Sequence, residues 1–190
     1  MNEAHTTTRP RRADARRNCE RIVAAARAAV ADRGGDVVLE DVAREAGVGI
    51  GTLYRHFPTR QALLEAVFLD EIRDLEVRGA ELAAEPSPLT ALLTWLRLQV
   101  EVGLHGHSMG ATVLNAKHTE GSEIQRAFQA ARATGAALLL RAQDAGDVRG
   151  EVEIGCLLRV LYGLALANGA SPDPDQLEAM FALVVAGMRA

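Results

Sequence analysis

Apolar residues recur along this chain at the three- and four-residue spacing of amphipathic helices, and we find no run of the strict alternation typical of half-buried strands. Alanine and leucine, which are strong helix formers, dominate the apolar positions. Glycine and proline clusters interrupt the pattern at intervals of helical length. The pattern therefore predicts an all-α protein.

The first sixty residues predict three helices. One over residues 15–33 carries a single apolar face and ends at Gly34-Gly35, a typical helix stop. A second covers 39–46, and a third, very short helix lies between Gly49 and Phe57. Three helices of these lengths are enough for one small module.

Further helices are expected after Pro58. Thr59 is placed to cap a long helix from 60 to about 82, and Ser87 or Pro88 to open the next one. The stretch from Gly103 to Gly110 is expected to break the chain. The remaining helices are expected at 110–118, 122–145, 154–168 and a last segment with the apolar stripe Leu177, Met180, Phe181, Val184 and Met188.

Length and composition fit a small module joined to a larger one. The chain has 190 residues, of which 48% are hydrophobic and 24% charged, so it can bury a substantial core. The longest apolar run, 156–167, is short and broken by Arg159, and the polar N-terminus resembles no signal peptide. We therefore expect a cytoplasmic protein without membrane association, in which Cys19 and Cys156 are reduced core residues.

The net charge of −4 hides an asymmetry between the two ends of the chain. Residues 1–60 carry eleven arginines and eight acidic residues, a net charge of +3, whereas the remainder carries ten basic and seventeen acidic residues, a net charge of −7. Six arginines fall in the first 21 residues. A basic end on an acidic body lets a phosphate backbone select one end of the molecule.

The segment 39–57 has the features of a helix-turn-helix. This motif needs a small residue where the two helices cross, a glycine for a left-handed turn, and an apolar residue that fills the corner. Ala43, Gly47 and Val48 supply these three at suitable spacing.

At these positions the sequence resembles the TetR family of transcriptional regulators. The resemblance covers about residues 15–68, and the remainder is similar to the family only in its number of helices. The matching positions are Val42-Ala43, Ala46-Gly47-Val48, Gly51-Thr52-Leu53-Tyr54-Arg55-His56-Phe57, Thr59-Arg60 and Leu63-Leu64. The resemblance implies a homodimer that binds a palindromic operator in double-stranded DNA and leaves it when a small-molecule effector binds. Repression is the default mode of action in this family.

Two positions depart from the family pattern. Gly49 replaces the serine that usually caps the recognition helix, and Val38 stands where Ser or Thr often caps the second helix. Valine is a poor N-cap, so we expect Asp36 or Glu40 to compensate. Arginine and tyrosine contacts must then supply more of the affinity for phosphate.

A short helix in the major groove presents one side to the base edges. On that basis Ile50, Thr52 and Arg55 are expected to read bases, with simple packing as the alternative for Ile50. Gly51 lets the backbone approach the DNA closely.

Phosphates are the expected partners of a second set of residues, which position the protein without reading sequence. Arg60 and the arginines near the N-terminus belong to it, and the resemblance adds Tyr54 and His56. The alternative role for His56 is a structural cap at the end of its helix.

The C-terminal part is expected to contain an effector pocket and a dimer interface, both implied by the resemblance. With only 4% aromatic residues, the pocket suits an aliphatic or small polar ligand. Its candidate lining residues, for each of which ordinary core packing is the alternative, are Trp95, Leu98, Val102, His105, Met109, Leu114, His118 and Phe128. The last two helices are expected to form a four-helix bundle with a second subunit. Its candidate residues are Leu157, Leu161, Leu177, Phe181, Val184 and Met188.

Other functions find less support in the sequence. His105, His107 and His118, with Glu101, have residue types suited to Zn or Ni, but we assign no metal and no cofactor. We find no enzyme motif that joins an acid, a base or a nucleophile, and therefore expect no catalytic activity. A relative that has lost DNA binding remains an alternative, which a salt-dependent gel shift would distinguish.

These features predict three parts. Residues 1–14 form a basic flexible arm, residues 15–58 the helix-turn-helix domain, and residues 59–190 the domain for effector binding and dimerisation.

Overall fold

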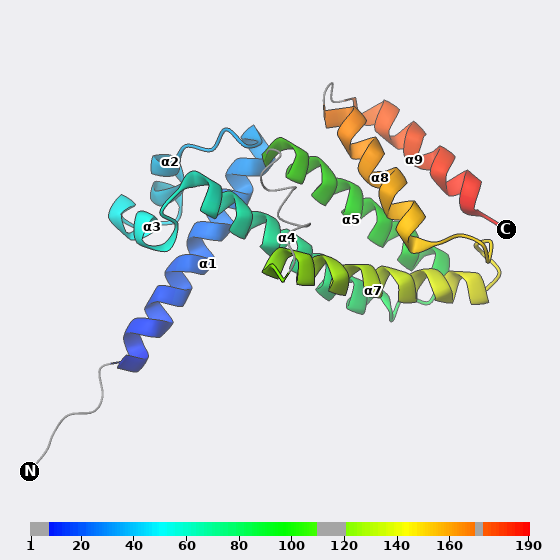
Figure 1. Ribbon diagram of the computed structural model, residues 1–190, viewed down its shortest axis with the longest axis horizontal. Coiled ribbons are helices and arrows are strands. Elements are labelled where there is room, and N and C mark those ends of the chain that lie inside the picture. The colour runs from blue at the N-terminus through cyan, green and yellow to red at the C-terminus, as the bar shows by residue number, and fades with distance from the viewer. Residues whose placement is uncertain (1–7, 110–120, 170–172) are drawn as a thin grey trace, which may run out of the picture. The chain divides into compact units, whose positions relative to one another are not determined.

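A computed structural model describes residues 8–109, 121–169 and 173–190, and every regular element in this part of the chain is a helix (Figure 1). The fold is therefore all-α, as predicted. The helices are α1 (Thr8–Arg33), α2 (Leu39–Glu45), α3 (Ile50–His56), α4 (Arg60–Leu82), α5 (Pro88–Met109), α7 (Glu123–Asp144), α8 (Ile154–Gly169) and α9 (Pro174–Met188).

The chain divides into two compact units, Met1–Val67 and Phe68–Ala190. The boundary between these units falls inside α4, after Val67, whereas the sequence pattern placed it between residues 58 and 59. Leu63, Leu64 and Val67, in the first two turns of α4, are buried.

Helix α1 begins earlier than the sequence pattern suggested. Residues 8–14, expected to belong to a flexible arm, are the first two turns of α1, which starts at Thr8. Pro10 is compatible with this start because the first turn of a helix needs no backbone N–H partner. The alanines and arginines that follow favour helix.

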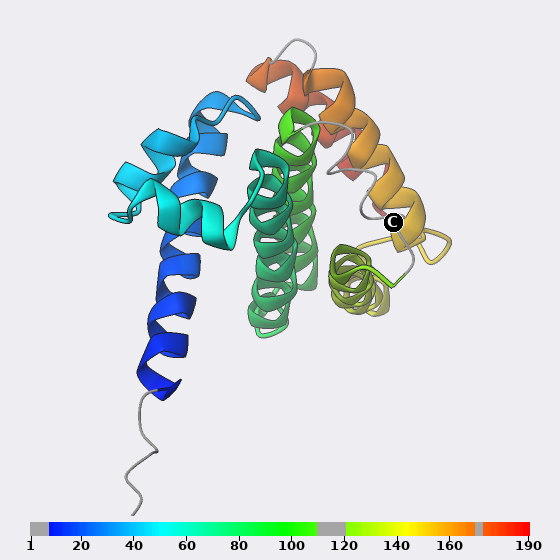
Figure 2. The same ribbon diagram turned by 60° about the vertical axis from the view of Figure 1, so that its left-hand side comes forward.

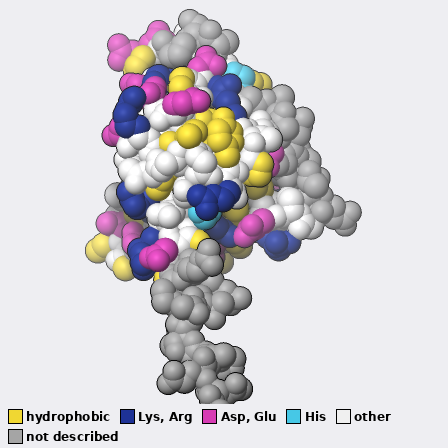
Figure 3. Space-filling view, turned by 90° about the vertical axis from the view of Figure 1, so that its left-hand side faces the viewer, with side chains coloured by type: hydrophobic (Ala, Val, Ile, Leu, Met, Phe, Trp, Pro, Cys, Tyr) yellow, Lys and Arg dark blue, Asp and Glu magenta, His cyan; other side chains and the backbone are white. Residues whose placement is uncertain are grey.

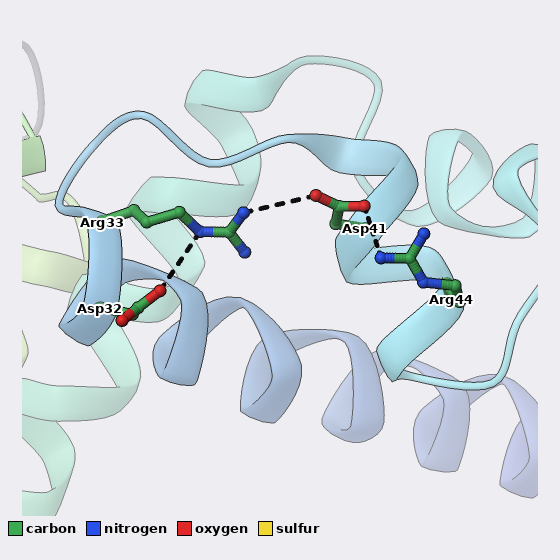
Figure 4. A network of polar contacts seen from close by, with 4 residues as sticks. All are labelled: Asp32, Arg33, Asp41 and Arg44. Carbon is green, nitrogen blue, oxygen red and sulfur yellow. Dashed lines mark hydrogen bonds and ion pairs between the residues drawn. The ribbon is translucent and has the colours of Figure 1, made fainter.

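The first unit is built from α1, α2 and α3 around a small apolar core. Its most buried side chains are Ile22, Ala26, Val30, Val42, Ala43 and Leu53. On the surface, Asp41 of α2 accepts hydrogen bonds from Arg33 at 3.3 Å and from Arg44 at 2.7 Å, and Arg33 also pairs with Asp32 (Figure 4). Exposed ion pairs of this kind stabilise by at most about 1 kcal/mol each, so the apolar core holds the unit together.

Helix α5 is the central element of the second unit. It packs against α7 and α8, and α8 packs in turn against α9; both ribbon views show the last two helices side by side (Figures 1 and 2). Arg97 of α5 holds Glu178 of α9 through two hydrogen bonds, at 2.5 and 2.7 Å, and stacks over the ring of Phe181. The hydrogen bond from Arg97 lowers the pKa of the Glu178 carboxyl.

Trp95 is the largest fully buried side chain of the second unit. Its indole N–H donates to the carbonyl oxygen of Leu75 on α4 at 3.1 Å. A Cβ on Gly135 of α7 would lie 2.2 Å from Cη2 of the indole, and one on Gly79 would lie 3.0 Å from its Nε1. Two glycines therefore make room for the ring between α4 and α7.

The expected break at residues 103–110 was wrong, because α5 continues without interruption to Met109. Gly103 lies where α5 passes α8, and a Cβ there would lie 3.0 Å from the Cβ of Ala165. This glycine allows a close helix contact and does not end the helix. The helix expected at 110–118 lies outside the described residues.

Cys19 is half-buried, and burial, followed by the charge of Glu20, raises the pKa of its thiol. Cys156 is exposed on α8, contrary to the expectation that it belongs to the core. Among the described residues, no helix is both long and apolar enough to cross a membrane.

Gly135→Ala should destabilise the second unit by about 1–3 kcal/mol, since the added methyl group overlaps the Trp95 ring in a close-packed core. Chemical unfolding followed by circular dichroism measures this loss. Phenylalanine at position 95 has a shorter side chain that does not reach as far as the indole. In a Trp95→Phe background, the Gly135→Ala substitution should therefore lower the free energy of unfolding much less. An equal loss of stability in both backgrounds would show that contact with Trp95 is not the reason for a glycine at position 135.

Candidate nucleic-acid interface and ligand cavity

The turn between α2 and α3 is fixed by backbone hydrogen bonds around Gly47, which has a φ of 61°. The Val48 N–H donates to the Ala43 carbonyl at 2.9 Å, and the Gly47 N–H donates to the Arg44 carbonyl at 3.0 Å. Arg21 of α1 donates to the Gly47 carbonyl at 3.1 Å. The roles expected of Ala43, Gly47 and Val48 thus correspond to an ordered turn that sets the direction of α3.

Helix α3 has a buried side and an exposed side. Leu53 and Phe57 point into the core of the first unit, whereas Ile50 is 39% and Tyr54 44% exposed. Figure 3 looks onto the side where α2 and α3 lie in Figure 1, and there hydrophobic side chains lie among arginines and acidic side chains. Packing within this chain therefore does not explain why large side chains stand at positions 50 and 54.

The other candidate contacts are also accessible. Arg55 is exposed, and its guanidinium donates to the Gly51 carbonyl at 3.0 Å and to Thr52 Oγ1 at 2.9 Å. Both contacts lie at the surface, so Arg55 can exchange them for another acceptor at low cost. Thr52 and His56 are half-buried.

Arg60 lies at the start of α4, where Thr59 Oγ1 accepts a hydrogen bond from the Ala62 N–H and caps the helix as expected. The Arg60 guanidinium pairs with Asp36 at 3.3 Å. Asp36 therefore engages Arg60 instead of replacing the missing cap of α2.

Neither α2 nor α3 has a side-chain cap. Val38 and Gly49 occupy the N-cap positions with extended backbone and accept no side-chain hydrogen bond. Glu40 and Asp41 lie in the first turn of α2, where their charges favour the positive end of the helix. Glu40 is therefore placed where it could compensate, and its compensation for the missing cap stays a prediction.

The second unit contains a cavity of about 260 Å³. Val102 and Phe128, both predicted, line it, and Phe128 meets the ring of Phe68 edge-on at 5.7 Å between centroids. The full lining is Phe68, Gln99, Val102, Gly103, Phe128, Arg132, Leu158, Arg159, Leu161 and Tyr162.

Sequence reasoning missed the polar part of this lining. Arg159 is the one charged residue between positions 154 and 169, and such an interruption of an apolar helix was a signal in the sequence. Arg132 carried no comparable signal, because α7 is a mixed helix that also carries Arg126 and Arg141.

Several predicted cavity residues lie elsewhere. Trp95 belongs to the core, and Leu98 lines a separate open groove beside α4. His105 Nδ1 lies 3.0 Å from Oε1 of the buried Glu71. Met109 is buried but does not line the cavity, and Leu114 and His118 lie outside the described residues.

The histidines considered for metal binding are separated. His105 faces Glu71, while His107 lies close to Gly169, and no group of three potential ligands gathers among the described residues. The third histidine, His118, lies outside this part of the chain.

The predicted dimer residues differ in how far their own chain buries them, and their role in a dimer stays a prediction. Leu157, Leu161, Phe181 and Met188 are buried within their own chain, and Leu177 and Val184 are half-buried. The most apolar side of α8 and of α9 packs onto this chain's own core, and the neighbouring side of each helix is exposed to solvent. The exposed side of these two helices carries Val160, Leu166 and Leu183, which are 41%, 46% and 74% exposed.

Comparison with known proteins gives matches for both units. Residues 22–67 match the family described as bacterial regulatory proteins, tetR family. Residues 87–190 match the family described as transcriptional regulator SbtR-like, C-terminal domain. No match was found among curated protein sequences.

Solved structures support the same assignment. The TetR transcriptional regulator SCO0520 from Streptomyces coelicolor is 35% identical, with 90% of this chain and 98% of that chain covered and a TM-score of 0.72. A TetR transcription regulatory protein from Mycobacterium vanbaalenii is 32% identical, with 94% and 99% covered and a TM-score of 0.66. A gamma-butyrolactone receptor shares the fold at 22% identity, with 93% and 90% covered and a TM-score of 0.58.

Gly47→Ala and Gly51→Ala should change the stability of the first unit in opposite directions. Alanine at 47 is strained at positive φ, and its Cβ would lie 2.4 Å from Arg21 Nη2, so we expect a loss of about 1–2 kcal/mol. Alanine at 51 meets nothing within 4 Å inside a helix and should add up to about 1 kcal/mol. Thermal unfolding measures both, and a stabilising Gly47→Ala would contradict the assigned turn.

Proposed function

The chain belongs to the TetR family of bacterial transcriptional regulators, and we propose that it represses transcription as a homodimer bound to a palindromic operator. A small molecule in the cavity of the second unit would release the DNA. The observation that carries this proposal is the exposed side of α3, where Ile50, Tyr54 and Arg55 face solvent from a helix fixed by the Gly47 turn.

On this proposal the exposed side of α3 enters the major groove of the operator. Arg55 binds a guanine edge through two hydrogen bonds, while Thr52 bonds a base edge and Ile50 contacts a thymine methyl group. The residues expected to bind phosphates, or to let the backbone approach them, are Gly51, Tyr54, His56 and Arg60.

We propose that the second subunit covers the exposed stripe of α8 and α9. Val160, Leu166 and Leu183 are large apolar side chains that this chain leaves in solvent. Cys156, Gly163 and Gly187 lie on the same two helices and would allow a close approach. Two-fold symmetry of the protein then requires an inverted repeat in the DNA.

Effector release would act through α4. This helix carries Arg60 at its start and Phe68, a cavity residue, two turns later. A ligand that prefers the conformation unable to bind DNA by about 1.4 kcal/mol would lower operator affinity tenfold. Because the Trp95 indole is hydrogen-bonded to the α4 backbone, its fluorescence can report a displacement of this helix.

Arg55→Ala and Arg60→Ala should weaken DNA binding in different ways. Loss of Arg55 should remove about 1–3 kcal/mol of discrimination between operator and random duplex, since it removes a base contact. Loss of Arg60 should weaken binding to both duplexes alike and reduce the salt slope by about one unit. Fluorescence anisotropy with both duplexes at several salt concentrations measures the two effects.

Arg78→Ala on the outer surface of α4 is the control for Arg60→Ala, because its partner Asp74 lies on the same helix. It should leave both affinities unchanged. If Arg55→Ala, like Arg60→Ala, weakens binding to operator DNA and to random DNA by the same factor, Arg55 does not read a base. Wild-type protein that binds no DNA at low salt would remove the proposed function itself.

Leu183→Glu should convert the dimer to monomers and lower operator affinity, because it places a charge at the centre of the proposed interface. Leu140→Glu on α7, where the side chain is 58% exposed, is the matched control and should leave the dimer intact. Analytical ultracentrifugation measures both. A Leu183→Glu protein that remains dimeric would place the interface elsewhere.

A further inference from the structure

The cavity combines an apolar floor with a cationic edge. Phe68 and Leu161 are each 1% exposed and form part of its floor, whereas Arg132 and Arg159 are exposed residues of the lining. None of the described residues that line it is acidic. The cavity therefore presents two positive charges beside a buried hydrocarbon surface.

Among the described residues, these two arginines differ from most others of the second unit in having no acceptor. Arg97 holds the carboxylate of Glu178, and Arg141 donates to the carbonyl oxygens of Leu82 and Glu85. Arg132 and Arg159 make no ion pair or side-chain hydrogen bond with any described residue. A guanidinium has five N–H donors and does not lose its charge, so both groups remain available for an anion.

Helix α8 brings the two guanidinium groups toward the same side. Arg132 Nη2 of α7 lies 3.0 Å from the position of a Cβ on Gly155, at the start of α8. Gly155 precedes Arg159 by four residues, which places both on one face of the helix. A side chain at 155 would occupy the place where Arg132 now lies.

We propose that this cavity binds a compact amphipathic carboxylate. Its carboxylate lies between Arg132 and Arg159, and its apolar body packs against Phe68, Phe128 and Leu161. Planar guanidinium groups match the two oxygens of a carboxylate, and Gln99 supplies a further hydrogen-bonding group in the lining. The inference rests on the proposed function, which makes this cavity the effector site.

The size of the cavity limits the ligand. Ligand pockets commonly enclose about 300–1,000 Å³, so a cavity of about 260 Å³ fits a small molecule better than a steroid or a long acyl chain. A neutral ligand of the same size would fill the floor and supply no negative charge to either arginine. The charge distribution therefore favours the anion.

The test compares matched pairs of aryl and alkyl carboxylates with their primary amides, from butyrate to 4-phenylbutyrate, on the full-length protein. Isothermal titration calorimetry gives the affinities. We expect carboxylates to bind at least tenfold more tightly than their amides. Arg132→Gln and Arg159→Gln should each remove most of this preference and leave amide binding unchanged, while Arg78→Gln should alter neither. Circular dichroism confirms that each variant is folded.

Equal affinities for acids and amides, or a preference that survives both substitutions, would overturn the carboxylate assignment. So would a series in which no acid binds. The proposed function is tested separately with operator DNA and with Gln99→Phe, which enlarges a half-buried side chain of the cavity lining. If the acid of the series that binds most tightly releases wild-type protein and the Gln99→Phe protein from operator DNA equally, the cavity is not the effector site, whatever the charge preference of the probes.

Discussion

The burial of Trp95 is the constraint on which the second unit depends. The indole needs both a hydrogen-bond acceptor and space, and it finds them at the Leu75 carbonyl and at two glycines on α4 and α7. Once the ring is in place, α4, α5 and α7 are held together around it. The cavity is lined by residues of these same helices and of α8, so its shape depends on the same packing.

The last two helices are held at both ends. Arg97 connects α5 to Glu178 near the start of α9. At the other end, the Arg149 N–H donates to the Met188 carbonyl at 3.0 Å, which joins the end of α9 to the turn before α8. These contacts determine which stripe of α9 faces inward, and therefore leave Leu183 outside as a candidate for contact with a second subunit.

The helix-turn-helix relies on its turn more than on side-chain caps. Val38 and Gly49 provide no cap, and the direction of α3 follows from the backbone hydrogen bonds around Gly47 and from the burial of Leu53. The exposed residues of α3 have no part in holding the fold. Under the proposed function, substitutions there would change DNA recognition with little effect on stability.

The sequence by itself determined the all-α fold, the helix-turn-helix and the exposed residues of α3, because these depend on local helical periodicity and on a glycine whose backbone conformation few other residues adopt. The tertiary structure decided which apolar stripe of α8 and α9 is core, that Gly103 is a contact and not a break, and that Arg132 joins Arg159 at one cavity. Periodicity finds an apolar face but not its partner, since a helix against its own core and a helix against a second subunit bury the same kinds of residue. The positions of Arg132 and Arg159 depend on how α7 packs against α8, which is a contact between residues distant in sequence.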